Sequence, residues 1–280
     1  MPIIITDMTP MSAALADLAH IWLRELQPTL SRYVIYTVGV WLALWVVLAP
    51  VLKPRKIREA TPPARQLLTE LMFSLRSMAV FATVGVLLTF MYRAGLYPLE
   101  TIADGWGPVW LGVSIVAGIV GLDTWFYWTH RMMHHPRLFR RFHRRHHRSN
   151  NPSPFTAYSF DIPEALVLVG FIVVWPAVFP MPSHAMQWVM LYQIVTNTLV
   201  HSGYELMPAR RDGRPMLDFI VTTTHHDLHH GQAGWNYAGW FTWWDRWMGT
   251  EHPEYLERYA RAAWRPFGAR PTAEPALAEG

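Results

Sequence analysis

The sequence predicts an all-α integral membrane protein with about three spanning helices, a short helical hairpin and a cytoplasmic helical cap rich in histidine. Composition supports this fold class, because 51% of the 280 residues are hydrophobic and only 16% are charged, against roughly 25% charged residues in soluble domains. Five long apolar segments divide the chain, and the 15 tryptophans suit a membrane interface. Most of the 14 histidines lie at or beyond the ends of these segments.

The first predicted element is an amphipathic helix over residues 13–27. Its apolar side chains recur at helical spacing, while its charged side chains lie elsewhere on the helix. We therefore expect this helix to lie in the membrane interface. The apolar positions are Leu15, Leu18, Trp22 and Leu26.

The next three apolar segments are the predicted spans. Residues 33–52 and 77–92 carry no charge, and residues 108–128 carry only Asp123. A hydrocarbon core of ~30 Å requires ~20 helical residues, which the first and third segments supply. The second reaches this length if the side chain of Arg76 extends to the interface.

The last two apolar segments, residues 165–179 and 185–200, predict a tight helical hairpin that barely spans the membrane or enters it partway. The alternative, buried core helices of a soluble protein, is disfavoured because one chain contains five such segments. After Trp264 the composition predicts a disordered tail.

The charges between these segments predict the topology. Residues 53–65 contain five basic residues and residues 131–148 contain seven arginines, whereas the loop 93–107 contains only Arg93. The positive-inside rule places the arginine-rich loops in the cytoplasm and the N-terminus outside. Because the basic residues are almost all arginine, we expect a bacterial protein of the inner membrane with its histidine-rich face toward the cytoplasm.

These elements predict three regions. Residues 1–107 would hold the interfacial helix and the first two membrane helices, residues 108–250 the catalytic domain, and residues 251–280 a C-terminal extension.

The histidines have the spacing of metal ligands. HRRHH and HDLHH are both HxxHH boxes, which present ligands at i, i+3 and i+4 of a helix, and an HxxxH pair precedes them. Imidazole suits zinc, copper, iron and nickel. Together with His201 these motifs supply nine ligands, too many for one ion and about right for two.

Other functions fit the sequence less well. A nucleic-acid or anionic-lipid tether would explain the arginines but not the matched histidine boxes. A non-enzymatic metal-binding or transport protein would favour ligands within the spans, whereas these cluster at one end. HExxH and glycine-rich nucleotide motifs are absent, and the lack of cysteine excludes thiolate metal sites.

Several motifs resemble the fatty acid hydroxylase/sterol desaturase superfamily, whose members are membrane enzymes with histidine boxes and two iron ions. The resemblance covers about residues 120–250, and its most specific part is the last motif. The motifs read DTWFYWTHRMMHH, FHRRHHRSNNPSPFTAYSFDIPEA, NTLVHSGYE and THHDLHHGQAGWNYAGWFTWWDRWMGT.

The resemblance implies nine metal ligands in this chain. They are His130, His134, His143, His146, His147, His201, His226, His229 and His230. His135 would replace His134 if the first pair is spaced by five residues instead of four. Asp161 stands where many relatives have histidine, so a contact beside the metals or the substrate differs here.

Further residues are candidates to complete or support the metal site. Asn197 and Glu205 flank His201 at four-residue distance and would reach the second metal directly or through water. The others are candidates to orient a liganding imidazole. They are His225, Asp123, Asp227 and Asp245.

The implied activity is O2-dependent hydroxylation or desaturation at an unactivated C–H bond of an apolar lipid that enters from the bilayer. Sterols, fatty-acyl or sphingoid chains, alkylglycerols and carotenoids all remain candidates. Because the chain has no flavin, nicotinamide or iron–sulfur motif, we expect an external electron donor, a ferredoxin or a cytochrome with its reductase. The arginine-rich face would attract such an acidic partner, and we expect no nucleic-acid partner.

Overall fold

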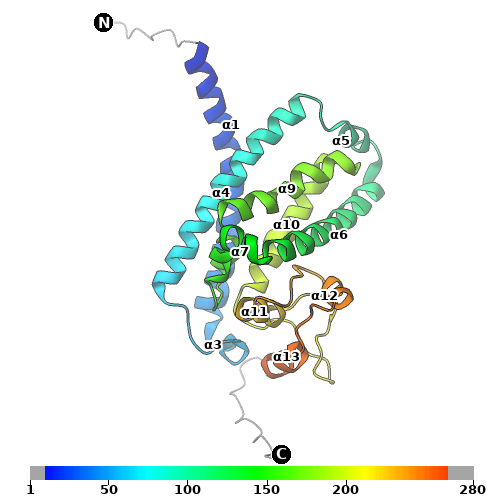
Figure 1. Ribbon diagram of the computed structural model, residues 1–280. Coiled ribbons are helices and arrows are strands. Elements are labelled where there is room, and N and C mark those ends of the chain that lie inside the picture. The colour runs from blue at the N-terminus through cyan, green and yellow to red at the C-terminus, as the bar shows by residue number, and fades with distance from the viewer. Residues whose placement is uncertain (1–9, 264–280) are drawn as a thin grey trace, which may run out of the picture.

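The computed structural model describes residues 10–263, which form helices joined by loops, with only isolated β-bridges between extended residues (Figure 1). The first half contains α1 (Pro10–Arg32), η1 (Tyr33–Val38), α2 (Gly39–Trp41), η2 (Leu42–Val47), α3 (Ala49–Leu52), η3 (Lys53–Arg55), α4 (Ala64–Arg93), α5 (Pro98–Ala103) and α6 (Gly107–Met133). The second half contains α7 (Pro136–Phe142), α8 (Arg144–His147), η4 (Pro154–Tyr158), α9 (Ile162–Val178), α10 (Ser183–Val200), α11 (Thr223–Gly231), α12 (Trp243–Met248) and α13 (Tyr255–Ala263). The tail predicted to be disordered lies outside the described residues.

Three helical runs are long and apolar enough to cross a membrane, which confirms the predicted number of spans. They cover Ala14–Val47, Ala64–Arg93 and Gly107–Met133. The hairpin is also confirmed, because α9 and α10 are joined by four residues and α9 is a shorter apolar helix.

The helix predicted over residues 13–27 is part of the longer α1, which continues into the first long helical run. Side-chain contacts hold this part of α1 against α4. The indole of Trp22 donates a hydrogen bond to Thr83 Oγ1 at 3.1 Å, and Leu26 packs on the hydrophobic core. Its position in the membrane interface stays a prediction.

The second span begins earlier than predicted, because α4 continues toward the cap over residues 64–76. Two charged side chains in this part of α4 form hydrogen bonds inside the protein. Glu70 is buried and accepts hydrogen bonds from Gln66 and Ser153. Arg76 donates to the carbonyl of Phe160. This end of α4 therefore anchors the loop that follows the histidine box at residues 143–147.

Close helix packing places the hairpin against the third span. α9 contacts α4 and α6, and α10 contacts α6. Two glycines of α6 allow this approach, because a Cβ on Gly118 would lie 2.7 Å from Val189 and one on Gly121 would lie 2.4 Å from Trp175. The hairpin thus fills the space between the long helices, as Figure 1 shows.

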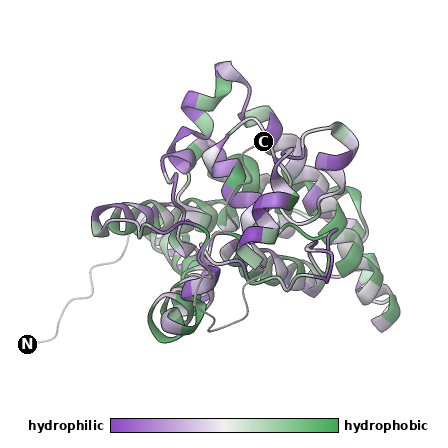
Figure 2. Cartoon of the chain, turned by 90° about the horizontal axis from the view of Figure 1, so that it is seen from below, coloured by the Kyte–Doolittle hydropathy of each residue, from purple (hydrophilic) through white to green (hydrophobic). Residues whose placement is uncertain are grey.

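The cap contains α7, α8, α11, α12 and α13. In Figure 1, α11, α12 and α13 lie below the long helices, and α7 lies beside the lower end of α6. Seen from below, hydrophilic segments gather over this end, while hydrophobic helices lie behind and around them (Figure 2). Two buried acids fasten the loop before α12. Asp123 accepts hydrogen bonds from the amides of Trp240 and Phe241, and Asp245 accepts from those of Tyr237 and Ala238.

Candidate metal centre

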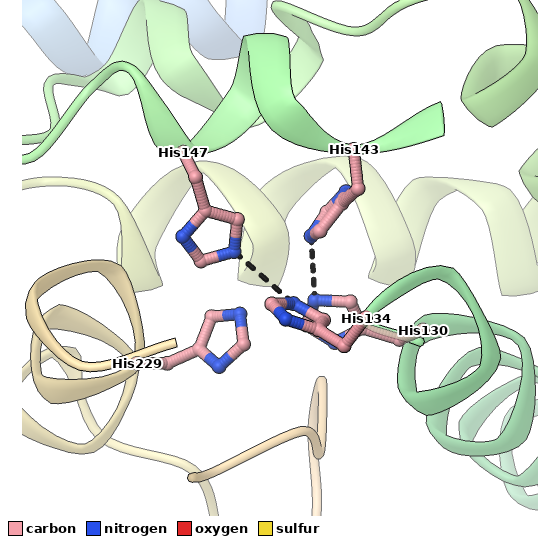
Figure 3. Close-up of side chains that lie close together, drawn as sticks. All are labelled: His130, His134, His143, His147 and His229. Atoms are coloured by element: carbon pink, nitrogen blue, oxygen red, sulfur yellow. Dashed lines mark hydrogen bonds between the residues drawn. The ribbon is translucent and has the colours of Figure 1, made fainter. Parts of the chain in front are cut away.

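The nine histidines predicted as ligands gather in two adjacent groups in the cap. We call them the five-histidine cluster, made of His130, His134, His143, His147 and His229, and the four-histidine cluster, made of His146, His201, His226 and His230. Within each cluster the ligand atoms all lie within 4.8 Å of one another. In Figure 3 the rings of the five-histidine cluster converge from three separate helical segments.

Each HxxHH box contributes to both clusters. The i and i+4 residues of the first box, His143 and His147, join the five-histidine cluster, whereas its i+3 residue joins the four-histidine cluster. The second box does the opposite, because His226 and His230 join the four-histidine cluster and His229 the other. Residues i and i+4 share one helix face and i+3 is turned away from i+4, so two facing helices complete both clusters.

The rings that connect the clusters are in contact. The centroids of His143 and His146 are 5.1 Å apart, and those of His147 and His230 are 5.2 Å apart. The two clusters are therefore direct neighbours, joined by contacts between their rings.

Hydrogen bonds on Nδ1 orient four of the nine rings. His130 Nδ1 contacts the carbonyl oxygen of Tyr237 at 2.7 Å, and His229 Nδ1 contacts that of Trp235 at 2.6 Å. His143 Nδ1 contacts Glu164 Oε1 at 2.7 Å. In the four-histidine cluster, His201 Nδ1 contacts the carbonyl oxygen of Asn197 at 2.7 Å. A proton held on Nδ1 leaves the Nε2 lone pair for a metal.

The Nε2 atoms face one another at distances that suit a shared ion. His130 and His143 are 2.8 Å apart at Nε2, and His134 and His147 are 3.1 Å apart. In the other cluster, His201 Nε2 lies 3.3 Å from that of His146 and 2.9 Å from that of His226. Two imidazole nitrogens bound at right angles to one ion at ~2.1 Å would be about 3.0 Å apart, so the donor set fits.

Buried nitrogens without a protein partner support the same conclusion. Within the described residues, they include Nε2 of His229, Nδ1 of His146 and of His226, and both ring nitrogens of His230. A buried polar atom without a partner is costly, and a metal ion would satisfy Nε2 of His229 and one ring nitrogen of His230.

Burial also keeps the ligands in the form that binds metal. It lowers the pKa of His143, His146, His226 and His230 well below the ordinary value, and it lowers that of His201 and His229 to about 4. These imidazoles are therefore neutral at pH 7, with a free lone pair.

Of the two alternative ligands His134 and His135, the structure places only His134 among the clustered histidines. His134 lies in the five-histidine cluster, whereas His135 is exposed and its Nδ1 accepts a hydrogen bond from the amide of Arg137 at the start of α7. His225 is buried outside both clusters, with its Nε2 3.6 Å from Asp245 Oδ2.

The side chains of Asn197 and Glu205 are taken up by other contacts. The amide of Asn197 donates to the carbonyl of Ala157, so this residue reaches His201 through its backbone. The carboxyl group of Glu205 accepts hydrogen bonds from the backbone and hydroxyl of Thr224 at 2.8 and 2.7 Å. Glu205 thereby fixes the first turn of α11, which carries the second box.

The three candidate aspartates hold the frame around the clusters. Asp123 also accepts a hydrogen bond from the indole of Trp243 at 2.7 Å. Asp227 pairs with Arg58 at 2.7 Å, which ties α11 to the loop after the first span. Asp245 fixes Tyr237, whose carbonyl orients His130. None of the three joins either cluster.

Glu164 is the site residue that the sequence analysis missed. It is 1% exposed at the start of α9, and its only signal was an acid next to a long apolar segment. The carbonyls of Tyr237 and Trp235 were also missed, because backbone groups leave no trace in residue types.

A cavity of about 250 Å³ adjoins both clusters. Three residues of its wall contact the liganding histidines. Phe126 lies 4.9 Å from His130 between ring centroids, Phe160 lies 5.5 Å from His146, and Asn197 bonds His201. The cavity continues between α1, α4, α6, α9 and α10, so an apolar molecule in it would lie next to the residues that contact the clusters.

Comparisons with known proteins identify the part of the chain that carries the clusters. Residues 115–250 match the fatty acid hydroxylase family model. The chain is 30% identical over 199 residues to lathosterol oxidase of Mus musculus, which covers 69% of this chain and 64% of that protein. It is 33% identical over 132 residues to methylsterol monooxygenase 1 of Rattus norvegicus, which covers 46% and 43%.

A third relative is a fungal protein, Delta(7)-sterol 5(6)-desaturase ERG3B of Gibberella zeae, with 30% identity over 152 residues that cover 54% of this chain and 46% of that protein. The chain spans about half to two thirds of the length of these relatives. No solved structure matches it. All nine clustered histidines fall within residues 115–250, whereas α1 and α4 lie outside this match.

Proposed function

The chain belongs to the fatty acid hydroxylase/sterol desaturase superfamily, and from this premise we propose that it is a membrane oxidoreductase that hydroxylates or desaturates an apolar lipid. The proposed cofactor is a pair of iron ions, one in each histidine cluster, and O2 is the co-substrate. The observation that carries this proposal is two adjacent histidine clusters at the end of a cavity between membrane helices.

The metal ions would supply O2 activation and the removal of hydrogen from an unactivated C–H bond. Hydroxylation consumes the lipid, one O2, two electrons and two protons, and it yields an alcohol and one water. Desaturation consumes the same reagents and yields an alkene and two waters.

The protein's own groups position the reaction. Tyr237, Glu164, Trp235 and Asn197 fix the imidazoles through Nδ1. The aromatic rings of Phe126 and Phe160 separate the lipid cavity from the clusters and exclude water beside them. Sterols are the first substrate class to test, because the relatives named above are sterol desaturases or oxidases by name.

The two electrons are proposed to come from a separate ferredoxin or cytochrome. The chain contains no cysteine for an iron–sulfur cluster. Exposed arginines on and beside α7 form a basic surface that suits an acidic donor. They are Arg137, Arg140, Arg141, Arg144 and Arg148. Arg145 differs, because its guanidinium packs 3.8 Å from the ring centroid of Phe73 and near Asp161.

The clusters are proposed to face the cytoplasm of a bacterial inner membrane. The basic loop after the first helical run is joined to the cap by the ion pair of Arg58 with Asp227, and the arginine-rich α7 is part of the cap. This arrangement is the one that the positive-inside rule favours for a cytoplasmic cap. Reporter fusions after Arg58 and Ser149 should then behave as cytoplasmic and one after Asp104 as external. A cytoplasmic signal at Asp104 would overturn this orientation.

The experiment that tests the function is a comparison of membrane lipids from cells that express the chain, cells without it, and cells that express the His201→Ala variant. A lipid changed by the mass of one added oxygen or by loss of two hydrogens should appear only with the unaltered chain. It should also require O2. Identical lipid profiles in all three strains, supplied with sterols and long-chain lipids, would contradict the proposal.

A further inference from the structure

The cavity beside the clusters has two chemically different ends. The aromatic rings of Phe126, Phe160 and Trp240 line its inner end, where the side-chain amide of Asn197 is bonded to the carbonyl of Ala157. Its outer end contains Glu25 of α1, next to Gly85 of α4, and we call it the polar end. Thr29 and Arg32 continue the cavity wall from Glu25 along the same face of α1.

The polar end is unusual because it puts a carboxyl group inside a membrane span. Glu25 lies within the apolar run Ala14–Val47, and its side chain is 30% exposed. Ionisable side chains in such segments are costly and usually serve a function. The nearest cation, Arg24, lies 3.5 Å away, is 58% exposed, and is therefore a weak partner.

The two helices around Glu25 make space for it. Thr89 of α4 donates a hydrogen bond to Glu25 Oε1 at 3.2 Å. Gly85, one turn earlier, faces the same side chain, and a Cβ there would lie 3.2 Å from Glu25 Cβ, Cγ and Oε2. Within residues 10–263, the side-chain hydrogen bonds to Glu25 go to Oε1. Oε2 therefore lies over Gly85 as an acceptor beside the cavity.

We propose that the polar end binds the hydroxyl group of the lipid substrate, with Glu25 as hydrogen-bond acceptor, while the apolar body of the lipid fills the rest of the cavity. This inference rests on the proposed function for the identity of the ligand as substrate. The ligand class is an amphiphile with one hydroxyl at its end. The site lies on α1 and α4, outside the family match, although its cavity extends to residues that contact the clusters.

The dimensions of the cavity set a further requirement on this ligand. Its wall runs along α4 from Met78 to Leu88, which is about 15 Å at 1.5 Å per residue. Glu25 contacts α4 at Gly85 and Thr89, and Phe160 packs in one core cluster with Met78. The hydroxyl group and the carbon next to Phe160 are therefore separated by about that distance. A sterol with its side chain or a long-chain alcohol meets this requirement, and a short alcohol does not.

Lipid binding to the full-length, metal-loaded protein in phospholipid nanodiscs tests the site. The probes are a radiolabelled 3-hydroxysterol and a long-chain primary alcohol, each compared with its methyl ether. The ether keeps the apolar body but donates no hydrogen bond. We expect at least one alcohol to bind roughly tenfold more tightly than its ether, as expected for a hydrogen bond to a carboxyl group.

Substitution of Glu25 should remove this preference. Glu25→Leu should bind the alcohol only as tightly as the ether, and Gly85→Ala should weaken alcohol binding by crowding Oε2. Gln27→Leu, on the exposed side of the same helix, should keep the full preference. If Glu25→Leu binds neither probe, Glu25→Gln is tested in its place. It should keep ether binding and show a reduced preference for the alcohol. An unchanged preference, or an equal loss of alcohol and ether binding in both variants, overturns the proposal.

A double variant separates this inference from the proposed oxidation. His146→Ala with His230→Ala removes two ligands of the four-histidine cluster, and it should make no product while it still prefers the alcohol. A wild-type protein that oxidises no lipid but shows the Glu25-dependent preference refutes the oxidation alone. A protein that oxidises lipid while Glu25→Leu keeps the preference refutes the hydroxyl site alone.

Discussion

The five-histidine and four-histidine clusters differ in how firmly their rings are held. In the five-histidine cluster, Nδ1 of His130, His143 and His229 each contacts an acceptor at 2.6 to 2.7 Å. In the four-histidine cluster, His201 alone among the four ligands has an Nδ1 contact of this kind, and His230 has no partner at either nitrogen within the described chain.

This difference indicates a division of roles. Rings fixed through Nδ1 are preorganised for a metal, and such contacts affect metal affinity by about 10- to 100-fold. The five-histidine cluster also has the larger donor set. We infer that it holds its ion more tightly, and that the four-histidine cluster has more freedom in ligand geometry and more open coordination for a reacting molecule.

The largest expected effect comes from changes in α8, which contributes one ligand to each cluster. His146→Ala with His147→Ala removes one ligand from each cluster, so the metal content should fall from about two ions toward zero and activity should be lost. His201→Ala affects the four-histidine cluster only and should leave about one ion. Metal analysis of the purified protein measures both.

A neighbouring histidine provides the control for this test. His135 is exposed and lies outside both clusters, so His135→Ala should keep about two ions and normal activity. The two-cluster assignment is wrong if His135→Ala loses metal or if His201→Ala keeps both ions.

The next largest effect concerns Glu164, which supports one cluster only. Glu164→Leu removes the acceptor of His143 Nδ1 and should weaken metal binding or activity by about 10- to 100-fold, with the loss confined to the five-histidine cluster. Glu164→Gln keeps an acceptor oxygen and should lose less. A metal titration followed by absorption spectroscopy measures the affinity.

Asp161 supplies the matched control, since it lies one turn earlier at the same helix end and contacts Arg76 and Arg145 instead of a histidine. Asp161→Asn should leave the metal affinity within about twofold, because partly exposed ion pairs contribute little. Equal losses in Glu164→Leu and Asp161→Asn would mean that the start of α9, and not the hydrogen bond, supports the cluster.

The sequence predicted most of the fold because a membrane span is a continuous apolar segment that can be recognised from consecutive residues. The apolar segments gave three spans and the hairpin, and these predictions are confirmed. The amphipathic pattern of residues 13–27 predicted a helix, but it did not reveal that Trp22 and Leu26 contact the rest of the protein.

For the site, helical spacing was informative within each box but not between boxes. The i, i+4 rule pairs His143 with His147 and His226 with His230, as the structure does. The exchange of His146 and His229 between the two clusters depends on how α8 and α11 face each other, which no local pattern records. Glu164 depends in the same way on contact between distant segments.

A smaller effect should appear when a chelator competes for the metals. We expect one ion to leave about tenfold faster than the other, because only one of the four Nδ1 atoms in the four-histidine cluster is fixed by an acceptor. His226→Ala should remove the fast phase, and His130→Ala should remove the slow phase. A single phase that is unaltered by either substitution would contradict the inferred difference in affinity.

The smallest effect concerns electron delivery, which the structure connects to the five-histidine cluster. The ring of Phe139 on α7 lies 5.4 Å from that of His134 and 5.5 Å from that of His147. The exposed Arg140 and Arg141 follow it on the same short helix. A donor that docks on α7 would therefore approach the five-histidine cluster first.

Arg140→Ala with Arg141→Ala should slow turnover a few-fold at low salt, since exposed charges mainly raise the rate of encounter. The difference should vanish at high salt, because the Debye length falls from ~10 Å at 0.1 M to ~3 Å at 1 M. Steady-state rates with an added ferredoxin or cytochrome and its reductase measure this effect. Product formed in one turnover of chemically reduced protein should not change, because docking is bypassed.

The control variant is Arg211→Ala, which removes a positive charge elsewhere, since Arg211 is exposed in the loop between α10 and α11. An equal slowing in that variant would assign the effect to net charge and exclude docking on α7.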